Sequence, residues 1–327
     1  MTRALVIGGT SLIGRPLVET LLAGGHEVTL LHRGQGTPFG DQVAELTGDR
    51  NDPARMAEVL GSSAFDLVFD NVYDWARGTT SDAVVATARA AAQDGLHRYV
   101  FMSSVAVYPE GGPWDEDSEM VPPTDPNLYA TQKAESERAL FALGQETGLA
   151  VTTLRPAFVY GPHNPFDREA FFWDRLRAGR PIILPEGGSR TMQWVHSGDV
   201  ARAAVEAATS EAGAGRAFNL AGPPVTQESY VQALARVAGV SAELVSVPRS
   251  ELQAAGGGVM EPPLYFGTYL DIPPITVEGS RLREAVGVEL RPLEAGLAQT
   301  YRWYLNQERP DPDVAWEEAL LASRGRG

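Results

Sequence analysis

Residues 4–14 read Ala-Leu-Val-Ile-Gly-Gly-Thr-Ser-Leu-Ile-Gly, and this stretch decides the fold. The four apolar residues are typical of a short buried strand, and a helix is expected to follow from about Ile13 to Ala23. The glycines of the intervening turn permit a tight bend and close packing of helix on strand, so that the first helical amides can face a pyrophosphate. A plain structural turn has the same pattern and stays an alternative. The candidate binding residues of this turn are Gly8, Gly9, Thr10, Ser11, Leu12, Ile13 and Gly14.

Strands and helices alternate along the next 140 residues. Further strands are expected at 27–31, 43–47, 66–69, 98–102 and 150–154, and helices at 53–60, 81–93 and 127–143. Asp52 is the expected N-cap of the first of these helices, and the segment 109–126 is expected to be a proline-rich acidic loop. The alternation predicts an α/β fold, a doubly wound parallel sheet of the Rossmann type with helices on both faces.

The expected division of the chain follows composition. Residues 1–162 with 193–222 are expected to form a dinucleotide-binding domain, and residues 307–327 a C-terminal tail that is either a docked helix or frayed. Residues 163–192 with 223–306 are expected to form a smaller mixed α/β substrate-binding region. Its many aromatic residues fit an apolar pocket, but such residues more often make a small core.

Polar and reactive residues follow the predicted strands, where parallel sheets bind their ligands. Arg33 follows the second strand, Asp49 the third and Asn71 the fourth, while Ser103 and Ser104 follow the fifth. We therefore expect these residues to lie along one edge of the sheet, together with the glycine-rich turn.

Lys133 is the single lysine of the chain, because the other 26 of its 27 basic residues are arginine. It stands four residues after Tyr129, and residues at this spacing share one face of a helix. A neighbouring ammonium favours the phenolate and lowers a tyrosine pKa from about 10. The pair therefore predicts a general acid/base that works near neutral pH. A solvated helix face is the alternative interpretation.

The end of the second predicted strand indicates the cofactor. An NAD site offers Asp or Glu to the adenosine ribose, but this chain has Leu30-Leu31-His32-Arg33-Gly34. Arg33 can pair with a 2′-phosphate, so NADP is favoured over NAD. A solvated surface arginine is again the alternative.

Composition excludes several classes of function. The chain has no cysteine, and its five histidines show no metal-ligand spacing, so no metal site is expected. A net charge of −15 disfavours binding to nucleic acid or to anionic membranes. No apolar stretch approaches the ~20 residues of a membrane span, and the amino terminus does not read as a signal peptide. We therefore expect a cytoplasmic protein with a small-molecule substrate.

Six motifs together give the chain its resemblance to a known family. They are Ile7-Gly8-Gly9-Thr10-x-x-x-Gly14, Gly48-Asp49-Arg50, Met102-Ser103-Ser104-Val-Ala-Val-Tyr108, Tyr129-x-x-x-Lys133, Leu154-Arg155-Pro156-x-x-x-Tyr160-Gly161-Pro162 and Val195-His196-x-x-Asp199-Val-Ala201. The chain resembles the extended short-chain dehydrogenases/reductases of the NAD(P)-dependent epimerase/dehydratase type. The likeness runs from residue 4 to about 222 and weakens toward Tyr304.

The resemblance implies roles for individual residues. Ser104 would hydrogen-bond the substrate oxygen, Tyr129 would exchange the proton, and Lys133 would hold the nicotinamide ribose and lower the tyrosine pKa. Asp49 would contact the adenine amino group. Pro156 and Ala157 would line the nicotinamide, and the remaining cofactor-binding positions would be Arg50, Asn71 and Val72.

Departures from the family pattern narrow the activity. Val105 and Ala106 stand where dehydratases of this family carry Asp-Glu, so a dehydratase is not expected. Phe158 and Met192 stand where many nucleotide-sugar enzymes carry an asparagine and an arginine that hold the diphosphate, although Arg190 lies close enough to substitute. These weak substrate-site candidates favour a substrate less charged than a nucleotide-diphospho-sugar, or a shifted pose.

Three functions stay open. The first is an NADP-dependent oxidoreductase or epimerase that acts on a sugar or sugar derivative through Ser104, Tyr129 and Lys133. The second is an NADPH-dependent carbonyl reductase for a less polar molecule. The third is a non-catalytic binder, because relatives that include a chloroplast RNA-binding group share the Gly-Gly-Thr start and an Arg-Gly after the second strand. Relatives also use the helices expected at 81–93 and 127–143 in a homodimer interface, and an intramolecular role fits these helices equally.

Overall fold

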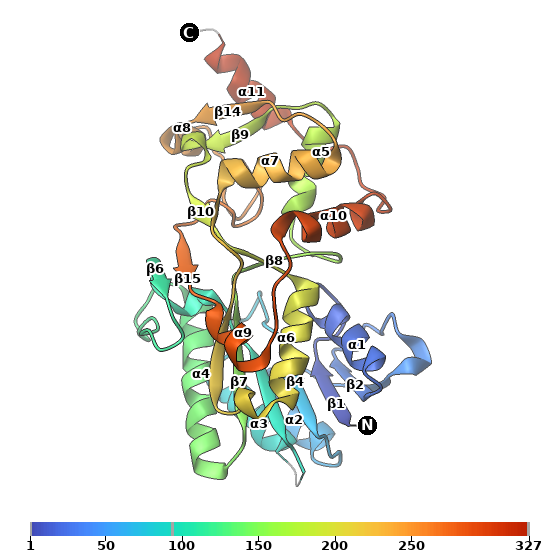
Figure 1. Ribbon diagram of the computed structural model, residues 1–327. Coiled ribbons are helices and arrows are strands. Elements are labelled where there is room, and N and C mark those ends of the chain that lie inside the picture. Colours follow the sequence, from blue (N-terminus) through green and yellow to red (C-terminus); the bar gives the residue numbers. More distant parts are fainter. Residues whose placement is uncertain (1, 93–94, 326–327) are drawn as a thin grey trace. The chain divides into compact units, whose positions relative to one another are not determined.

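The computed structural model describes residues 2–92 and 95–325, which form two compact units (Figure 1). The first unit runs to Val159 and takes in Val195–Gly222 and Ile275–Leu290. The second unit comprises Tyr160–Trp194, Pro223–Pro274 and the chain from Arg291 onward. Residues 275–290 thus belong to the first unit, although the sequence analysis grouped them with the second.

A seven-stranded sheet forms the centre of the first unit. Its order is β3-β2-β1-β4-β5-β7-β12, and every neighbouring pair is parallel. The predicted parallel α/β sheet is therefore confirmed. The order turns back on itself between β1 and β4, which is where ligands of such sheets bind. The strands are β1 (Arg3–Ile7), β2 (Glu27–His32), β3 (Ala44–Thr47), β4 (Leu67–Asp70), β5 (Arg98–Met102), β7 (Val151–Pro156) and β12 (Arg216–Leu220).

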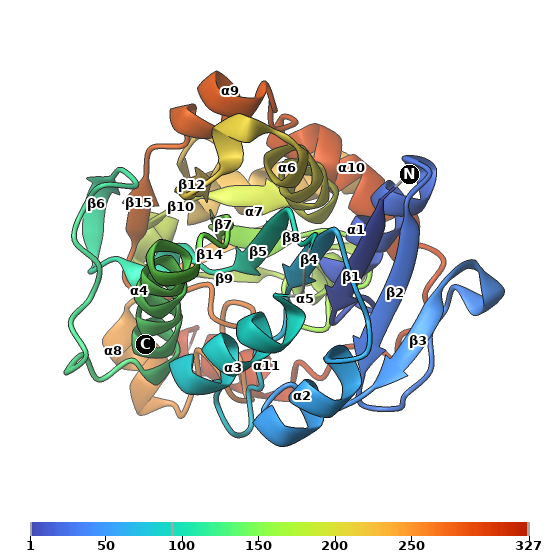
Figure 2. The same cartoon turned by 90° about the horizontal axis from the view of Figure 1, so that it is seen from below.

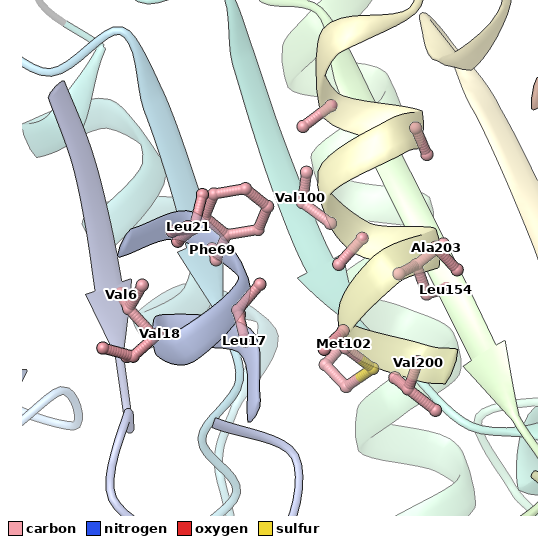
Figure 3. Packing of buried hydrophobic residues seen from close by; sticks show 14 of the residues in the cluster. Val6, Leu17, Val18, Leu21, Phe69, Val100, Met102, Leu154, Val200 and Ala203 are labelled. Atoms are coloured by element: carbon pink, nitrogen blue, oxygen red, sulfur yellow. The ribbon is translucent and has the colours of Figure 1, made fainter. Parts of the chain in front are cut away.

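Helices cover both faces of this sheet (Figure 2). One face carries α1 (Gly14–Ala23), α6 (Ser197–Thr209) and α9 (Ser280–Val286), and the other carries α2 (Pro53–Leu60), α3 (Ser81–Ala91) and α4 (Leu128–Thr147). Figure 3 shows the packing on the first face, where Leu17 and Leu21 of α1 lie beside Phe69 of β4 and Ala203 of α6 lies beside Leu154 of β7. This apolar burial is the main force that holds the layers together.

Three details of the first unit differ from the expectations. The helix expected to end at residue 143 continues to Thr147, because Gly148 supplies the left-handed φ of 80° that ends it. The segment expected to be a loop contains β6 (Gly111–Trp114), which pairs with β15 (Ile275–Val277). Glu116, expected on a solvated loop, is 8% exposed and pairs with Arg281 at 3.2 Å.

Other local expectations are confirmed. The side chain of Asp52 accepts a hydrogen bond from the Arg55 amide at 3.0 Å and so caps α2. The helix expected at 81–93 begins as expected and ends at Ala91, and its expected last residue lies outside the described part of the chain.

The second unit is smaller and mixed. Its aromatic residues form a core, in which Phe172, Trp173 and Tyr230 are buried and the Trp173 indole donates to the Leu234 carbonyl. The predicted tail contains a docked helix, held by a buried pair between Arg175 and Glu317 at 2.7 Å. The helices are α5 (Glu169–Arg177), α7 (Gln227–Ala238), α8 (Arg249–Ala254), α10 (Leu293–Tyr304) and α11 (Ala315–Arg324).

Short strands complete the second unit. Strand β9 (Ile182–Pro185) pairs in parallel with β14 (Leu244–Val247), and β10 (Thr191–Met192) pairs antiparallel with β13 (Val225–Thr226). The chain passes between the units within β8 (Phe158–Tyr160) and just after the start of β11 (Trp194–His196). In the described part of the chain, no helix is both long enough and apolar enough to cross a lipid bilayer.

Candidate functional site

The glycine-rich turn lies between β1 and α1, as predicted. Gly8 has a φ of 84°, and a Cβ atom on Gly14 would lie 1.9 Å from the Gly8 carbonyl oxygen, so neither position accommodates a side chain. Among the described residues, no side chain caps the first turn of α1. The start of α1, uncapped by a side chain and with a backbone that can be approached closely, fits the pyrophosphate of a dinucleotide.

The residues after β4 meet this turn. The Asn71 side-chain amide donates to the Gly8 carbonyl oxygen at 3.2 Å, and the Val72 side chain occupies the space beside Gly8. Asn71 therefore positions the glycine-rich turn through a direct hydrogen bond, which places the ends of β1 and β4 at one point on the sheet edge.

A charged cluster lies at the ends of β2 and β3. Arg77 pairs with Asp49 at 2.7 Å and with Asp74 at 2.6 Å, and Arg33 reaches the same Asp74 carboxylate at 3.4 Å. Burial raises the pKa of Asp49, but a hydrogen bond from the Asn51 amide and the pairing with Arg77 outweigh it, so the pKa is lowered. Both arginines are exposed, and the carboxylates of Asp49 and Asp74 already pair with them, so an anion bound at this end of the site would compete with these carboxylates.

Lys133 is buried in the first unit and lies over the end of β5. Its Nζ donates to the Met102 carbonyl oxygen at 2.6 Å and lies 4.7 Å from the centre of the Phe101 ring. Burial lowers the pKa of Lys133 to about 8; Asp70 and Glu137 raise it in part, and Arg50 lowers it further. The lysine is not a solvated surface group, because only 4% of it is exposed.

Tyr129 lies in the first turn of α4 among other aromatic rings. The Lys133 Nζ is 6.0 Å from the centre of its ring. The indole of Trp75 stacks on the phenol with 4.9 Å between ring centres and a 21° angle. Tyr73 stands nearly perpendicular to the phenol, 4.7 Å away between ring centres, and donates its hydroxyl to the Gln132 side chain at 2.9 Å.

The two serines after β5 have different environments. Ser103 is buried and donates to the carboxylate of Glu137, which also pairs with Arg155 at 2.7 Å. Ser104 is half-buried, and its Oγ accepts from the Ala106 amide at 3.1 Å at the start of the short helical turn Val105–Val107. Ser103 thus belongs to a buried ionic network, while Ser104 is accessible at the sheet edge.

The remaining first-unit candidates are partly internal. Arg50 is 3% exposed and forms an ion pair with Asp70, whose carboxylate also accepts from the Tyr99 hydroxyl at 2.7 Å. The positive charge of Arg50 is therefore neutralised by Asp70 in the interior of the first unit. Pro156 ends β7 in the interior, and Ala157 and Phe158 follow it half-buried.

Two substrate-site candidates lie in the second unit. The Arg190 guanidinium pairs with Asp271 at 3.2 Å, and Arg249 reaches the same carboxylate at 2.8 Å. Met192 is 4% exposed in β10. The charge of Arg190 is thus already engaged by a buried carboxylate.

Sequence reasoning missed the loop after β4. Tyr73, Trp75 and Arg77 lie in it, and Gln132 of α4 anchors it by accepting from the Thr79 amide at 2.9 Å. This segment has neither periodicity nor a family motif. The one sequence feature that could have indicated this loop is its position directly after β4 and Asn71.

Comparison with known proteins identifies the family. The model of the NAD dependent epimerase/dehydratase family matches residues 4–221. A chloroplast stem-loop binding protein of 41 kDa (b) from Arabidopsis thaliana is 30% identical over 72% of this chain, and the match spans 63% of that protein. A 3-diazoavenalumate denitrifying reductase from Streptomyces sp. is 33% identical over 64% of this chain and 73% of its own length. A UDP-glucose 4-epimerase from Mycolicibacterium smegmatis is 28% identical over 94% of this chain and all of its own length.

Solved structures show the same fold. The UDP-glucose 4-epimerase of Thermotoga maritima with UDP-glucose matches with a TM-score of 0.76 at 21% identity, covering 93% of this chain and 98% of that chain. The UDP-glucose 4-epimerase of Thermus thermophilus in complex with NAD matches with a TM-score of 0.72 at 24% identity, covering 94% of this chain and all of that chain. The predicted extended short-chain dehydrogenase/reductase resemblance and enzyme class are confirmed: the chain belongs to the NAD dependent epimerase/dehydratase family.

Proposed function

We propose that this protein is an NAD(P)-dependent oxidoreductase or epimerase that acts on a hydroxyl or carbonyl group of a sugar or sugar derivative, with Ser104, Tyr129 and Lys133 as its catalytic residues. The observation that carries the proposal is the buried Lys133 beside Tyr129 at the sheet edge that also bears the glycine-rich turn. A lysine is costly to bury, so its retention there indicates a chemical role.

The residues divide the chemistry among them. Ser104 offers a hydroxyl to the substrate oxygen, and Tyr129 accepts the substrate's hydroxyl proton during oxidation or donates a proton to a carbonyl oxygen during reduction. Lys133 stabilises the phenolate by its nearby positive charge. The hydrogen bond from the Ala106 amide to the Ser104 Oγ restricts rotation of the Ser104 side chain and so holds the hydroxyl in place. When bound, a nicotinamide cofactor supplies the hydride acceptor or donor.

The chain's own geometry fits such a cofactor. The glycine-rich turn between β1 and α1 would let a pyrophosphate approach the backbone closely, and the family name gives NAD as the cofactor type. Arg33 and Arg77 lie where the adenosine end would lie, and a 2′-phosphate would pair with both. We therefore propose NADP as the preferred form, with NAD as the alternative.

A second candidate is a carbonyl reductase for a less polar molecule. Phe158 is apolar and half-buried, and Arg190 is already paired with Asp271, which leaves the diphosphate of a nucleotide sugar without these two partners. The Streptomyces relative is named a reductase, and the mycobacterial relative a UDP-glucose 4-epimerase. A stem-loop binding role, taken from the name of the chloroplast relative, is opposed by the net charge of −15.

Cofactor binding is the first test. Calorimetry of purified protein, after spectral inspection for copurified nucleotide, gives the Kd values of NADP(H) and NAD(H). We expect Arg33→Ala to weaken NADPH binding roughly 10- to 100-fold, the value of one charge-assisted hydrogen bond, and to leave NADH within about threefold. Arg89→Ala, on the exposed surface of α3, is the matched control. Retained NAD that is insensitive to Arg33 would contradict the NADP assignment.

Turnover is the second test. NADPH consumption with a carbonyl compound separates a reductase from an epimerase, because an epimerase returns its hydride and consumes no cofactor. UDP-glucose and UDP-galactose are assayed for interconversion in parallel. In either reaction Tyr129→Phe should reduce kcat by at least about 100-fold without changing the cofactor Kd. Full activity of Tyr129→Phe would refute the catalytic assignment.

A further inference from the structure

A large apolar side chain lies open beside the proposed acid/base. Trp75 is 55% exposed although its indole stacks on the Tyr129 phenol. Single exposed apolar residues are common, but Leu128, the neighbour of Tyr129 in α4, is 60% exposed as well. Trp75 is thus one of the most exposed large apolar side chains of the described residues, and its indole lies against the Tyr129 ring.

The indole is held in place by its loop. The amides of Ala76 and Arg77 both donate to the Asp74 carboxylate at 3.0 Å, and the Asp74 amide bonds the Thr79 hydroxyl at 3.1 Å. Tyr73 meets the indole edge-on at 5.0 Å between ring centres. The backbone on both sides of Trp75 is thus hydrogen-bonded, and its indole packs against the rings of Tyr73 and Tyr129.

A further apolar surface lies against the first half of α4. Val105 and Ala106, which follow Ser104, are half-buried and pack against a cluster that includes Ala130 and Ala134 of α4. The nearest ammonium, that of Lys133, is buried and already donates to the Met102 carbonyl. These side chains offer dispersion contacts to a ligand, and they offer a diphosphate no charge.

We propose that Trp75 forms the substrate-binding wall beside Tyr129 and selects a substrate that presents an aromatic or flat apolar body next to its reacting hydroxyl or carbonyl. The inference rests on the proposed function, because it takes Tyr129 as the acid/base. It decides between the two substrate classes in favour of the less polar one. The indole also fixes the orientation of the phenol, since stacked aromatic rings restrict each other's tilt.

Ternary complexes that cannot react test this wall without a known substrate. An alcohol and a reduced cofactor each carry a hydride and neither can accept one, so no transfer takes place between them. 2-Naphthylmethanol or UDP-glucose is therefore titrated calorimetrically into protein saturated with NADPH. We expect 2-naphthylmethanol to bind more tightly than UDP-glucose. Trp75→Ala should weaken 2-naphthylmethanol about three- to tenfold, the value of one aromatic contact, while Trp75→Phe stays within about threefold of the parent.

The controls separate this inference from the proposed function. Met260→Ala removes an apolar side chain of similar exposure in the second unit and should leave the Kd unchanged. Tighter binding of UDP-glucose than of 2-naphthylmethanol, or a Kd for 2-naphthylmethanol that Trp75→Ala leaves unchanged, would overturn the wall. Dissociation of a dimer into monomers on Trp75→Ala, measured by sedimentation, would also overturn the wall, because Trp75 would then belong to a subunit interface. Failure of the parent to bind either cofactor is a different result and refutes the proposed function itself.

Discussion

Replacing Lys133 by methionine tests the energetics of the buried ammonium. The pKa of Lys133 falls from 10.5 to about 8 on folding, chiefly through burial. A tenfold change in proton affinity corresponds to about 1.4 kcal/mol, so keeping this side chain protonated at pH 7 costs the folded state about 3 kcal/mol. Methionine has a similar length and no charge. It loses the hydrogen bond to the Met102 carbonyl, which costs about 1–3 kcal/mol.

The two contributions have different pH dependence. Between pH 8 and 10.5 the unfolded lysine is protonated and the folded one is not, so the parent gains stability as the pH rises. The lost hydrogen bond does not titrate. We therefore expect Lys133→Met to be as stable as the parent or more so at pH 7, and to lose about 3 kcal/mol relative to the parent by pH 10.5.

Urea unfolding followed by circular dichroism at several pH values measures this difference. Lys133→Arg is the matched control, because arginine stays charged throughout the window and its difference from Lys133→Met should be independent of pH. A parent–methionine difference that is flat from pH 7.5 to 10.5 would refute the reasoning, since it would mean that folding leaves the proton affinity of Lys133 unchanged.

Two further substitutions test the glycine-rich turn and the buried ion pair of Glu137. Gly14→Ala places a methyl group 1.9 Å from a backbone carbonyl oxygen, so we expect at least tenfold weaker cofactor binding by calorimetry. Its control, Gly25→Ala, lies at a positive φ in open space and should lower the free energy of unfolding by about 1 kcal/mol without changing cofactor binding. Glu137→Gln leaves the buried Arg155 without its counter-charge and should cost about 3–5 kcal/mol in urea unfolding. Glu146→Gln, which breaks an exposed pair, should cost less than about 1 kcal/mol, and equal losses for both would contradict the burial argument.

The sequence predicted those features that depend on short-range pattern. The strand, the glycine-rich turn and the helix at 4–23 follow from neighbouring residues, and so does the Tyr129–Lys133 spacing on α4. The place of Asn71 at the same sheet edge as the turn followed from the predicted parallel sheet, because parallel strands end at one edge, and its hydrogen bond to Gly8 was seen only in the structure. Local pattern was therefore sufficient for six of the seven strands, but it missed β12 (Arg216–Leu220) and the internal ion pair of Arg50 with Asp70.

Long-range pairing could not be predicted in the same way. Strand β6 exists because β15 lies beside it, about 160 residues later, and Glu116 is buried because Arg281 meets it there. Trp75 stands in an irregular loop, where neither helical nor strand periodicity constrains a side chain. Its contact with Tyr129 depends on hydrogen bonds to Gln132 and Thr79 that the sequence does not announce.

All basic residues of the chain except Lys133 are arginine, and this has a practical consequence. Apart from the α-amino group, Lys133 is the single primary amine of the chain, and 4% of it is exposed. With a pKa of about 8, about half of it is an uncharged nucleophile at that pH. An acylating reagent also modifies the α-amino group, so intact-mass spectrometry would follow the second acylation, which reports the opening of the protein around Lys133. The acylation rate of Lys133 therefore measures how often this part of the protein opens, and a bound ligand that covers Lys133 would lower that rate.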